Sequence, residues 1–232
     1  MIPVAVPAPE NEPPHFNANC REPGHEWLAA NPTKDPHDQS EWWRQFQPDL
    51  AKHFNYRCGW EATWIGLAGI VEHWLSCGPR KGVASPHRHL AFEWSNYRYA
   101  NGVVNSRKGI LDDQVLDPCE VQDGWFVVHL PSFQLLPTDN IPAGLKDKAK
   151  LTLDVLQLRR GHQARWTRWD WYRRYWNNGT PDLVNLSRDA PLVAAAVEAA
   201  QLAGRALPNP DDCLPAHAIV ARKRRYRPRI RN

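Results

Sequence analysis

The placement of proline is the feature that most constrains the fold of this chain. Eight of its 21 prolines fall within the first 39 residues, at Pro3, Pro7, Pro9, Pro13, Pro14, Pro23, Pro32 and Pro36. Proline fixes its own φ and has no N–H to donate, so a segment this rich in proline does not sustain a long helix or an interior strand. We therefore predict that residues 1–39 form an extended arm, with one short ordered stretch around residues 26–30.

The rest of the chain predicts helices mixed with short strands. Ser40 and Ser187 suit helix N-caps, and Pro191 suits the first turn of the alanine-rich helix after Ser187. Gly109 suits the position just after a helix, whereas Pro48 interrupts or restarts one. The expected elements are a helical region over 40–54, strands over 69–74 and 125–130, and helices over 101–108, 146–158, 163–176 and 187–206.

Positive charge is concentrated near the C-terminus. Residues 222–232 hold seven basic side chains and no acidic one, namely Arg222, Lys223, Arg224, Arg225, Arg227, Arg229 and Arg231. Removing these seven charges from the net charge of +4 leaves −3 for the rest of the chain. Such a tail attracts polyanions, which favours binding to nucleic-acid phosphates, and the alternative is a solvated tail that only aids solubility.

Cysteine usage and hydropathy indicate the compartment. The chain has five cysteines, and no two of them form a Cys-x-x-Cys pair. An odd number of cysteines, without a secretion signal at the start, is typical of a reducing, cytoplasmic setting. No apolar run approaches the roughly 18 residues of a membrane-spanning helix, so we expect no membrane association.

Three short pieces carry residue types that suit phosphodiester chemistry. They read Val-Glu-His-Trp at 71–74, Phe-Glu-Trp-Ser-Asn-Tyr-Arg at 92–98 and Asn-Ser-Arg-Lys-Gly at 105–109. An acid beside a histidine, an asparagine in a Trp-x-Asn context and an asparagine followed by basic residues resemble the motif of HNH, or ββα-metal, nucleases. The resemblance covers roughly residues 15–176 and includes the Leu-Asp-Pro at 116–118.

The resemblance implies an α+β fold with a ββα-metal core, a β-hairpin packed on one helix, embedded in surrounding helices. It gives four parts: an N-terminal arm over 1–39, a nuclease domain over 40–180, a C-terminal helix over 181–210 and a basic tail over 211–232. The implied activity is endonucleolytic cleavage of nucleic acid, with DNA preferred, in a bacterial or phage defence setting. A regulating protein partner would fit a nuclease of this kind.

The same resemblance assigns roles to four residues. His73 would act as general base, since imidazole accepts a proton near neutral pH. Glu72 and Asn105 would supply oxygen ligands to Mg²⁺ or Mn²⁺, with Glu72 also counted in the catalytic centre. Asn96 would hold the loop and orient the ring of His73. Taken singly these residues have plainer interpretations: a half-buried histidine, a turn asparagine at 96 and a helix cap at 105.

Two departures from the family pattern affect this hypothesis. The acid is Glu72, where aspartate is commoner, and the extra methylene changes the reach of the carboxylate. Many HNH proteins also have two Cys-x-x-Cys pairs that bind a structural Zn²⁺, whereas Cys58 is alone here, so no structural zinc is expected. The alternative function is therefore a catalytically inactive HNH-fold module that binds nucleic acid or a partner protein.

Residues 159–176 interleave arginines with aromatic side chains, a combination that can stack on bases and bind phosphates. Trp166, Trp169, Trp176 and either Tyr172 or Arg173 also fall on one helical face, which is typical of packing on a core. We predict core packing on that face and phosphate-facing arginines on the other. The candidate nucleic-acid-binding residues are Arg107, Lys108, Arg165, Arg168, Arg222, Lys223, Arg224 and Arg225.

Overall fold

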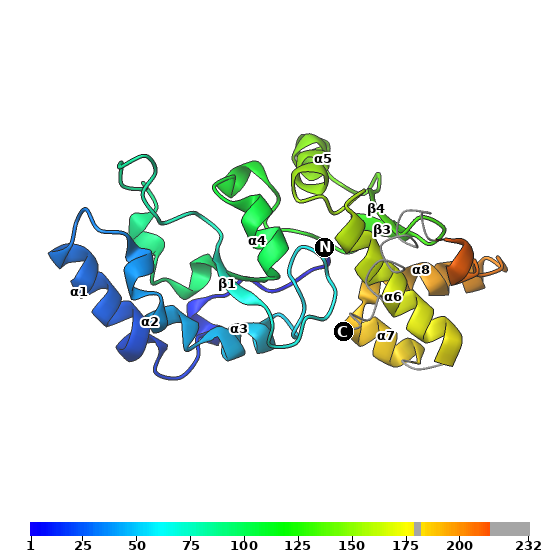
Figure 1. The fold of residues 1–232 in the computed structure, drawn as a ribbon, viewed down its shortest axis with the longest axis horizontal. Coiled ribbons are helices and arrows are strands. Elements are labelled where there is room, and N and C mark those ends of the chain that lie inside the picture. The colour runs from blue at the N-terminus through cyan, green and yellow to red at the C-terminus, as the bar shows by residue number, and fades with distance from the viewer. Residues whose placement is uncertain (179–181, 214–232) are drawn as a thin grey trace, which may run out of the picture.

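The structure, a computed structural model, describes residues 1–178 and 182–213. The molecule is elongated, and two groups of elements lie side by side along its length (Figure 1). The first group holds α1 (Glu22–Ala30), α2 (Glu41–Arg44), α3 (Gln47–His53), β1 (Ile70–His73), β2 (Tyr97–Ala100) and α4 (Gly102–Lys108). The second holds β3 (Phe126–His129), β4 (Gln134–Pro137), α5 (Lys146–Val155), α6 (His162–Asn178), α7 (Leu183–Asp189) and α8 (Pro191–Leu202).

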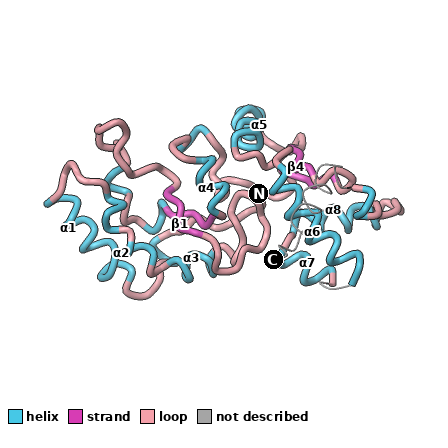
Figure 2. Tube along the Cα trace, viewed as in Figure 1, coloured by secondary structure: helices cyan, strands magenta, loops and turns pink. Residues whose placement is uncertain are grey.

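Helices and loops dominate the described part of the chain, and the strands form two short antiparallel pairs (Figure 2). This is the mixed α+β class that the sequence predicts. No helix among residues 1–178 and 182–213 is both long enough and apolar enough to cross a bilayer. Buried apolar side chains form two clusters, one built mainly from each group, and Ala100 of β2 and Val104 of α4 belong to the cluster of the second group.

The N-terminal segment is more ordered and more deeply packed than an extended arm. A π-helical turn over Asn17–Arg21 runs directly into α1, and Pro23 is tolerated because it sits in the first turn. Phe16 and Cys20 are fully buried, and Phe16 packs edge-to-face on the ring of Tyr97 in β2. The prediction of an extended arm is wrong, because these apolar side chains complete the first core.

β1, β2 and α4 form a strand–loop–strand–helix unit. The two strands pair antiparallel, with Ile70 opposite Ala100 and His73 opposite Tyr97. The side chain of Asn101 caps α4 by accepting from the N–H of Val104. Gly109 follows the helix with φ of 48°, the left-handed region in which glycine avoids the strain of a Cβ atom. The predicted strand over 69–74 and the helix that ends before Gly109 are both confirmed.

A buried ion pair fastens β2 to the segment that leads into the second group. The guanidinium of Arg98 donates two hydrogen bonds to the carboxylate of Asp117, at 2.6 and 2.5 Å, and both side chains are almost wholly buried. Bidentate geometry of this kind satisfies the donors and acceptors that burial removes from water. Asp117 belongs to the Leu-Asp-Pro piece, so in this structure that piece braces the ββα unit.

The second group is built on the β3–β4 hairpin and the four C-terminal helices. Side chains from these elements, including Leu135, Leu153, Trp169 and Val197, share one core. The single helix expected over 187–206 is instead two helices, α7 and α8, because Pro191 has no N–H with which to continue α7. Asp182, not Ser187, supplies the N-cap of α7, and Pro191 begins α8.

Candidate functional site

A cavity of about 710 Å³ opens between the ββα unit and the segment that precedes α3. One wall comes from β1 and α4, and another comes from residues 35–47. The loop after β1 and the turn after α4 form the rim. The residues that line the cavity include Asp35, His37, Trp43, Arg44, Glu72, His73, Ser76, Gly78, Arg80 and Asn105.

His73 ends β1 and lies at the back of this cavity with 6% of its surface exposed. Its Nε2 lies 2.9 Å from the carbonyl oxygen of Ala91, which can only accept, so Nε2 carries the proton. The lone pair of the neutral ring is then on Nδ1. Burial lowers the pKa of His73 to about 4, so the ring is neutral at neutral pH. Edge-to-face contacts with Trp43 and Tyr97 fix the ring plane.

Glu72 is the residue before His73, and its carboxylate forms an ion pair with the buried ammonium group of Lys108. Lys108, at the end of α4, is wholly buried, with Nζ 2.7 Å from Glu72 Oε1 and 3.0 Å from the carbonyl oxygen of His73. The ring of Trp74 lies 5.7 Å from the same Nζ. Burial raises the pKa of Glu72, and Lys108 opposes that shift. We therefore correct the prediction for Lys108: its amine neutralises Glu72 and is not exposed to a nucleic-acid phosphate.

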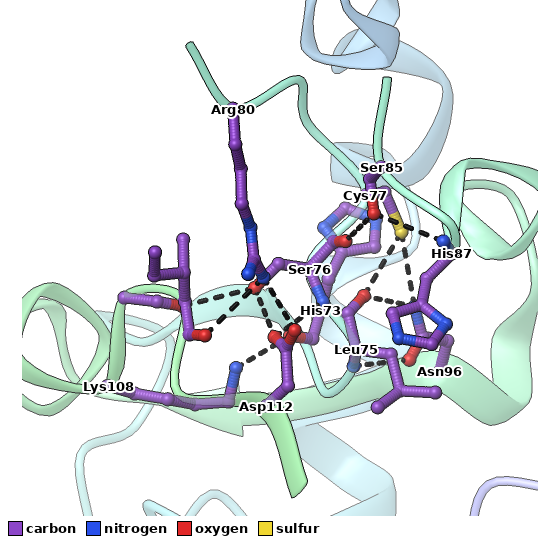
Figure 3. Close-up of polar contacts among 12 residues, drawn as sticks. His73, Leu75, Ser76, Cys77, Arg80, Ser85, His87, Asn96, Lys108 and Asp112 are labelled. Atoms are coloured by element: carbon purple, nitrogen blue, oxygen red, sulfur yellow. Dashed lines mark hydrogen bonds and ion pairs between the residues drawn. The ribbon is translucent and has the colours of Figure 1, made fainter. Parts of the chain in front are cut away.

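Asn96 holds the loop between β1 and β2 closed (Figure 3). It ends a 3₁₀ turn over Trp94–Asn96, just before β2, and only 3% of it is exposed. Its amide donates to the carbonyl oxygens of Leu75 and Leu90, at 3.0 and 3.3 Å, and its Oδ1 accepts from the N–H of Leu75 at 2.8 Å. The loop-holding part of its predicted role matches this geometry. The ring of His73 donates its hydrogen bond to the carbonyl oxygen of Ala91 and not to Asn96.

Asn105 projects from α4 into the wall of the cavity and is half-buried. Together with the Glu72 carboxylate it offers oxygen donors of the kind that Mg²⁺ and Mn²⁺ prefer. Among the described residues no three histidine, cysteine, aspartate or glutamate side chains converge as a metal site. Glu72 and Asn105 would supply only two oxygen ligands, so a cation held there would complete its coordination with water, as Mg²⁺ commonly does.

Two sets of polar residues at this cavity were missed by the sequence analysis. Asp112 accepts hydrogen bonds from the N–H and hydroxyl of Ser76 and from the guanidinium of Arg80, which anchors the start of the loop after β1 (Figure 3). Asp35 and His37 lie on the opposite wall, joined by a hydrogen bond of 2.8 Å. Nothing in the spacing of these residues along the chain indicates that they meet, because the fold brings them together.

Three of the other predicted nucleic-acid-binding residues, Arg107, Arg165 and Arg168, do not line the cavity. Arg168 is 1% exposed, and one of its nitrogens donates to the carbonyl oxygens of Phe133 and Leu158, so it braces the second core and does not face a ligand. Arg107 and Arg165 are half-buried and donate to the carbonyl oxygens of Leu156 and Ser132. The tail residues Arg222, Lys223, Arg224 and Arg225 lie outside the described residues.

The aromatic face of α6 packs on the second core. Trp169 and Tyr172 are buried in the second core, and Trp166 is partly buried beside them. Trp176 is 41% exposed, so the predicted apolar face ends one turn earlier than expected. Arg174 is exposed on the other side and pairs with Asp170 at 2.6 Å. Core packing on one face is confirmed, and Arg174 on the other side is engaged in an intrahelical ion pair.

Comparisons with known proteins return no match: no family model, curated protein or solved structure matches this chain.

Proposed function

We propose that this protein is a metal-dependent HNH-type endonuclease that hydrolyses phosphodiester bonds of nucleic acid, with DNA as its substrate. The observation that carries the proposal is the order strand, loop, strand and helix, which sets Glu72, His73 and Asn105 around one cavity. The hydrogen bonds of Asn96 that close the loop give further support.

His73 would serve as the general base. Its Nδ1 lone pair takes one proton from a water molecule that attacks phosphorus. A bond forms between phosphorus and the water oxygen as the bond to the leaving oxygen breaks. The carbonyl of Ala91 fixes the required tautomer, since it holds the proton on Nε2.

Glu72 and Asn105 are the residues that would hold a divalent cation beside this base. When bound, such a cation neutralises phosphate charge and lowers the pKa of a coordinated water molecule. Lys108 keeps Glu72 charged and fixed in the protein interior, because a buried carboxylate without a partner tends to take up a proton. Arg44 is exposed on the rim and offers a guanidinium to a neighbouring phosphate of the same strand.

The inactive binding module is the competing function, and one observation favours it. The ammonium of Lys108 already neutralises the Glu72 carboxylate. In a binding module the two side chains would form a structural ion pair, and Glu72 would not be a metal ligand. A module of this kind binds DNA and leaves it intact with either metal.

Variants of the two key side chains separate these possibilities. His73→Ala and Asn105→Ala are compared with His129→Ala, a control in which an exposed histidine outside the cavity is removed. With Mg²⁺ and supercoiled plasmid, we expect His73→Ala to lower the cleavage rate by on the order of 10² to 10⁴, and the control to match wild type. Equal rates for His73→Ala and wild type would refute the assignment of the base.

A further inference from the structure

The Asp35–His37 pair is a second acid–base unit on the cavity. Asp35 caps the 3₁₀ turn Pro36–Gln39, and its Oδ1 accepts from the backbone N–H of His37 at 3.0 Å. The same oxygen lies 2.8 Å from Nδ1 of the His37 ring. Because a carboxylate accepts and does not donate, Nδ1 carries a proton, and Nε2 is the nitrogen left for a ligand.

Packing holds the His37 ring close to His73. The two ring centroids are 5.5 Å apart, and the ring of Trp43 lies edge-on to both. Gly78, in the loop after β1, packs closely against Asp35 and His37. A Cβ atom on Gly78 would lie 3.2 Å from Cε1 of His37 and 3.4 Å from Oδ1 of Asp35. A side chain on Gly78 would crowd the pair, so the loop can pack this closely only because Gly78 has none.

The two imidazoles stand in different environments. His73 is 6% exposed and hydrogen-bonded to a backbone carbonyl, whereas the side chain of His37 is 50% exposed and bonded to a carboxylate. Paired catalytic groups whose surroundings differ in this way commonly divide the acid and base roles between them. His73 donates from Nε2 to a carbonyl oxygen, so its Nδ1 lone pair is the one left to accept a proton. The ring of His37 is held at Nδ1 by a carboxylate, so Nε2 is the nitrogen left to give a proton.

We propose that His37 is a second catalytic residue, the general acid that protonates the leaving oxygen, and that Asp35 positions it. The inference rests on the nuclease function proposed above. As water attacks phosphorus and gives one proton to His73, the bond from phosphorus to the leaving oxygen breaks. His37 acts in its imidazolium form: Nδ1–H stays bonded to Asp35, and the leaving oxygen takes the proton from Nε2. Before the next turnover His73 releases its proton to solvent and Nε2 of His37 takes one up from solvent.

The test compares two leaving groups in the same DNA. Wild type is first used to map the bond that it cuts and which side keeps the phosphate. A duplex oligonucleotide is then made with sulfur in place of the leaving oxygen at that bond. A thiolate departs without a proton far more readily than an alkoxide, so a missing general acid costs little on this substrate.

His37→Ala is expected to lower cleavage of the oxygen substrate by on the order of 10² to 10⁴ and to leave cleavage of the sulfur substrate close to wild type. His37→Gln, which keeps a polar group of similar size, is run beside it, and urea denaturation shows that both variants fold. Asp35→Asn is expected to give a smaller loss with the same selectivity for the oxygen substrate. His73→Ala is expected to lower both rates.

Three results overturn the inference. Equal loss on both substrates for His37→Ala and His37→Gln would give His37 a role in folding or water activation, and the nuclease proposal would stand. No loss on either substrate would remove His37 from the mechanism, again with the nuclease proposal intact. A wild-type protein that cuts neither substrate with Mg²⁺ or Mn²⁺ would overturn both proposals together.

Discussion

The buried ion pair between Lys108 of α4 and Glu72 of β1 is expected to stabilise the ββα unit, and removing its ammonium group tests this. Replacing Lys108 with methionine keeps a long apolar stem and removes only the ammonium group. Glu72, which is 8% exposed, then loses the donor at 2.7 Å that neutralises it. Removing one partner of a buried ion pair costs about 3–5 kcal/mol, because the other charge is left without compensation.

The loss of stability in Lys108→Met is expected to depend on pH. Burial already raises the pKa of Glu72, and without Lys108 nothing in the pair opposes that shift. In Lys108→Met the folded protein therefore binds a proton at Glu72 more tightly than the unfolded chain does. The penalty is largest above the raised folded pKa and shrinks as pH falls through it, by about 1.4 kcal/mol for each pH unit.

Urea denaturation of purified variants measures this effect directly. Lys146→Met is the matched control, since Lys146 pairs with a fully exposed Asp139 and should cost no more than about 1 kcal/mol. The double variant Glu72→Gln with Lys108→Met removes both charges and should recover most of the lost stability. A loss below about 1 kcal/mol for Lys108→Met, or no recovery in the double variant, would refute the argument that the pair is a compensated buried charge.

Two further predictions concern the frame around the cavity. Burial raises the pKa of Asp112, but hydrogen bonds from Ser76 and Arg80 outweigh that effect, so the pKa is lowered overall. Asp112→Asn should therefore lower the free energy of unfolding at neutral pH by about 1–2 kcal/mol. Since the folded pKa lies below the unfolded value, this contribution is present above about pH 4 and is lost as pH falls through the folded pKa. Urea midpoints whose separation does not narrow as pH falls below about 4 would contradict it. Gly24→Ala should cost at least about 1–3 kcal/mol, because a Cβ atom there would lie 2.2 Å from Cγ of Phe92; an unchanged midpoint in urea would show that α1 does not pack as described.

Local signals in the sequence predicted part of the fold well. The strand that ends in Glu72-His73 and the helix that stops before Gly109 follow from apolar runs and from a residue suited to a left-handed φ. Pro191 begins α8 for the reason expected, since its missing N–H costs nothing in a first turn. These features depend on residues close together in the chain.

Features that depend on distant packing were not predicted. Lys108 was expected to bind a phosphate because it follows Asn105 in the nuclease-like motif, and Arg168 because arginines alternate with aromatic residues over 159–176. Both side chains are instead buried with specific partners. Phe16 was assigned to an extended arm because proline density is a local signal and says nothing about an apolar ring finding a core. His37 reaches the cavity only through the fold, so its place beside His73 has no counterpart in the spacing of the sequence.

The proposed function is cleavage of phosphodiester bonds at the cavity around His73. Its most direct test is wild-type protein incubated with supercoiled plasmid in Mg²⁺, in Mn²⁺ and in excess EDTA, with gel-shift binding measured on the same samples. We predict nicked and linear plasmid with at least one metal and none with EDTA. Plasmid that is bound but remains supercoiled with both metals would contradict the claim and favour the inactive binding module.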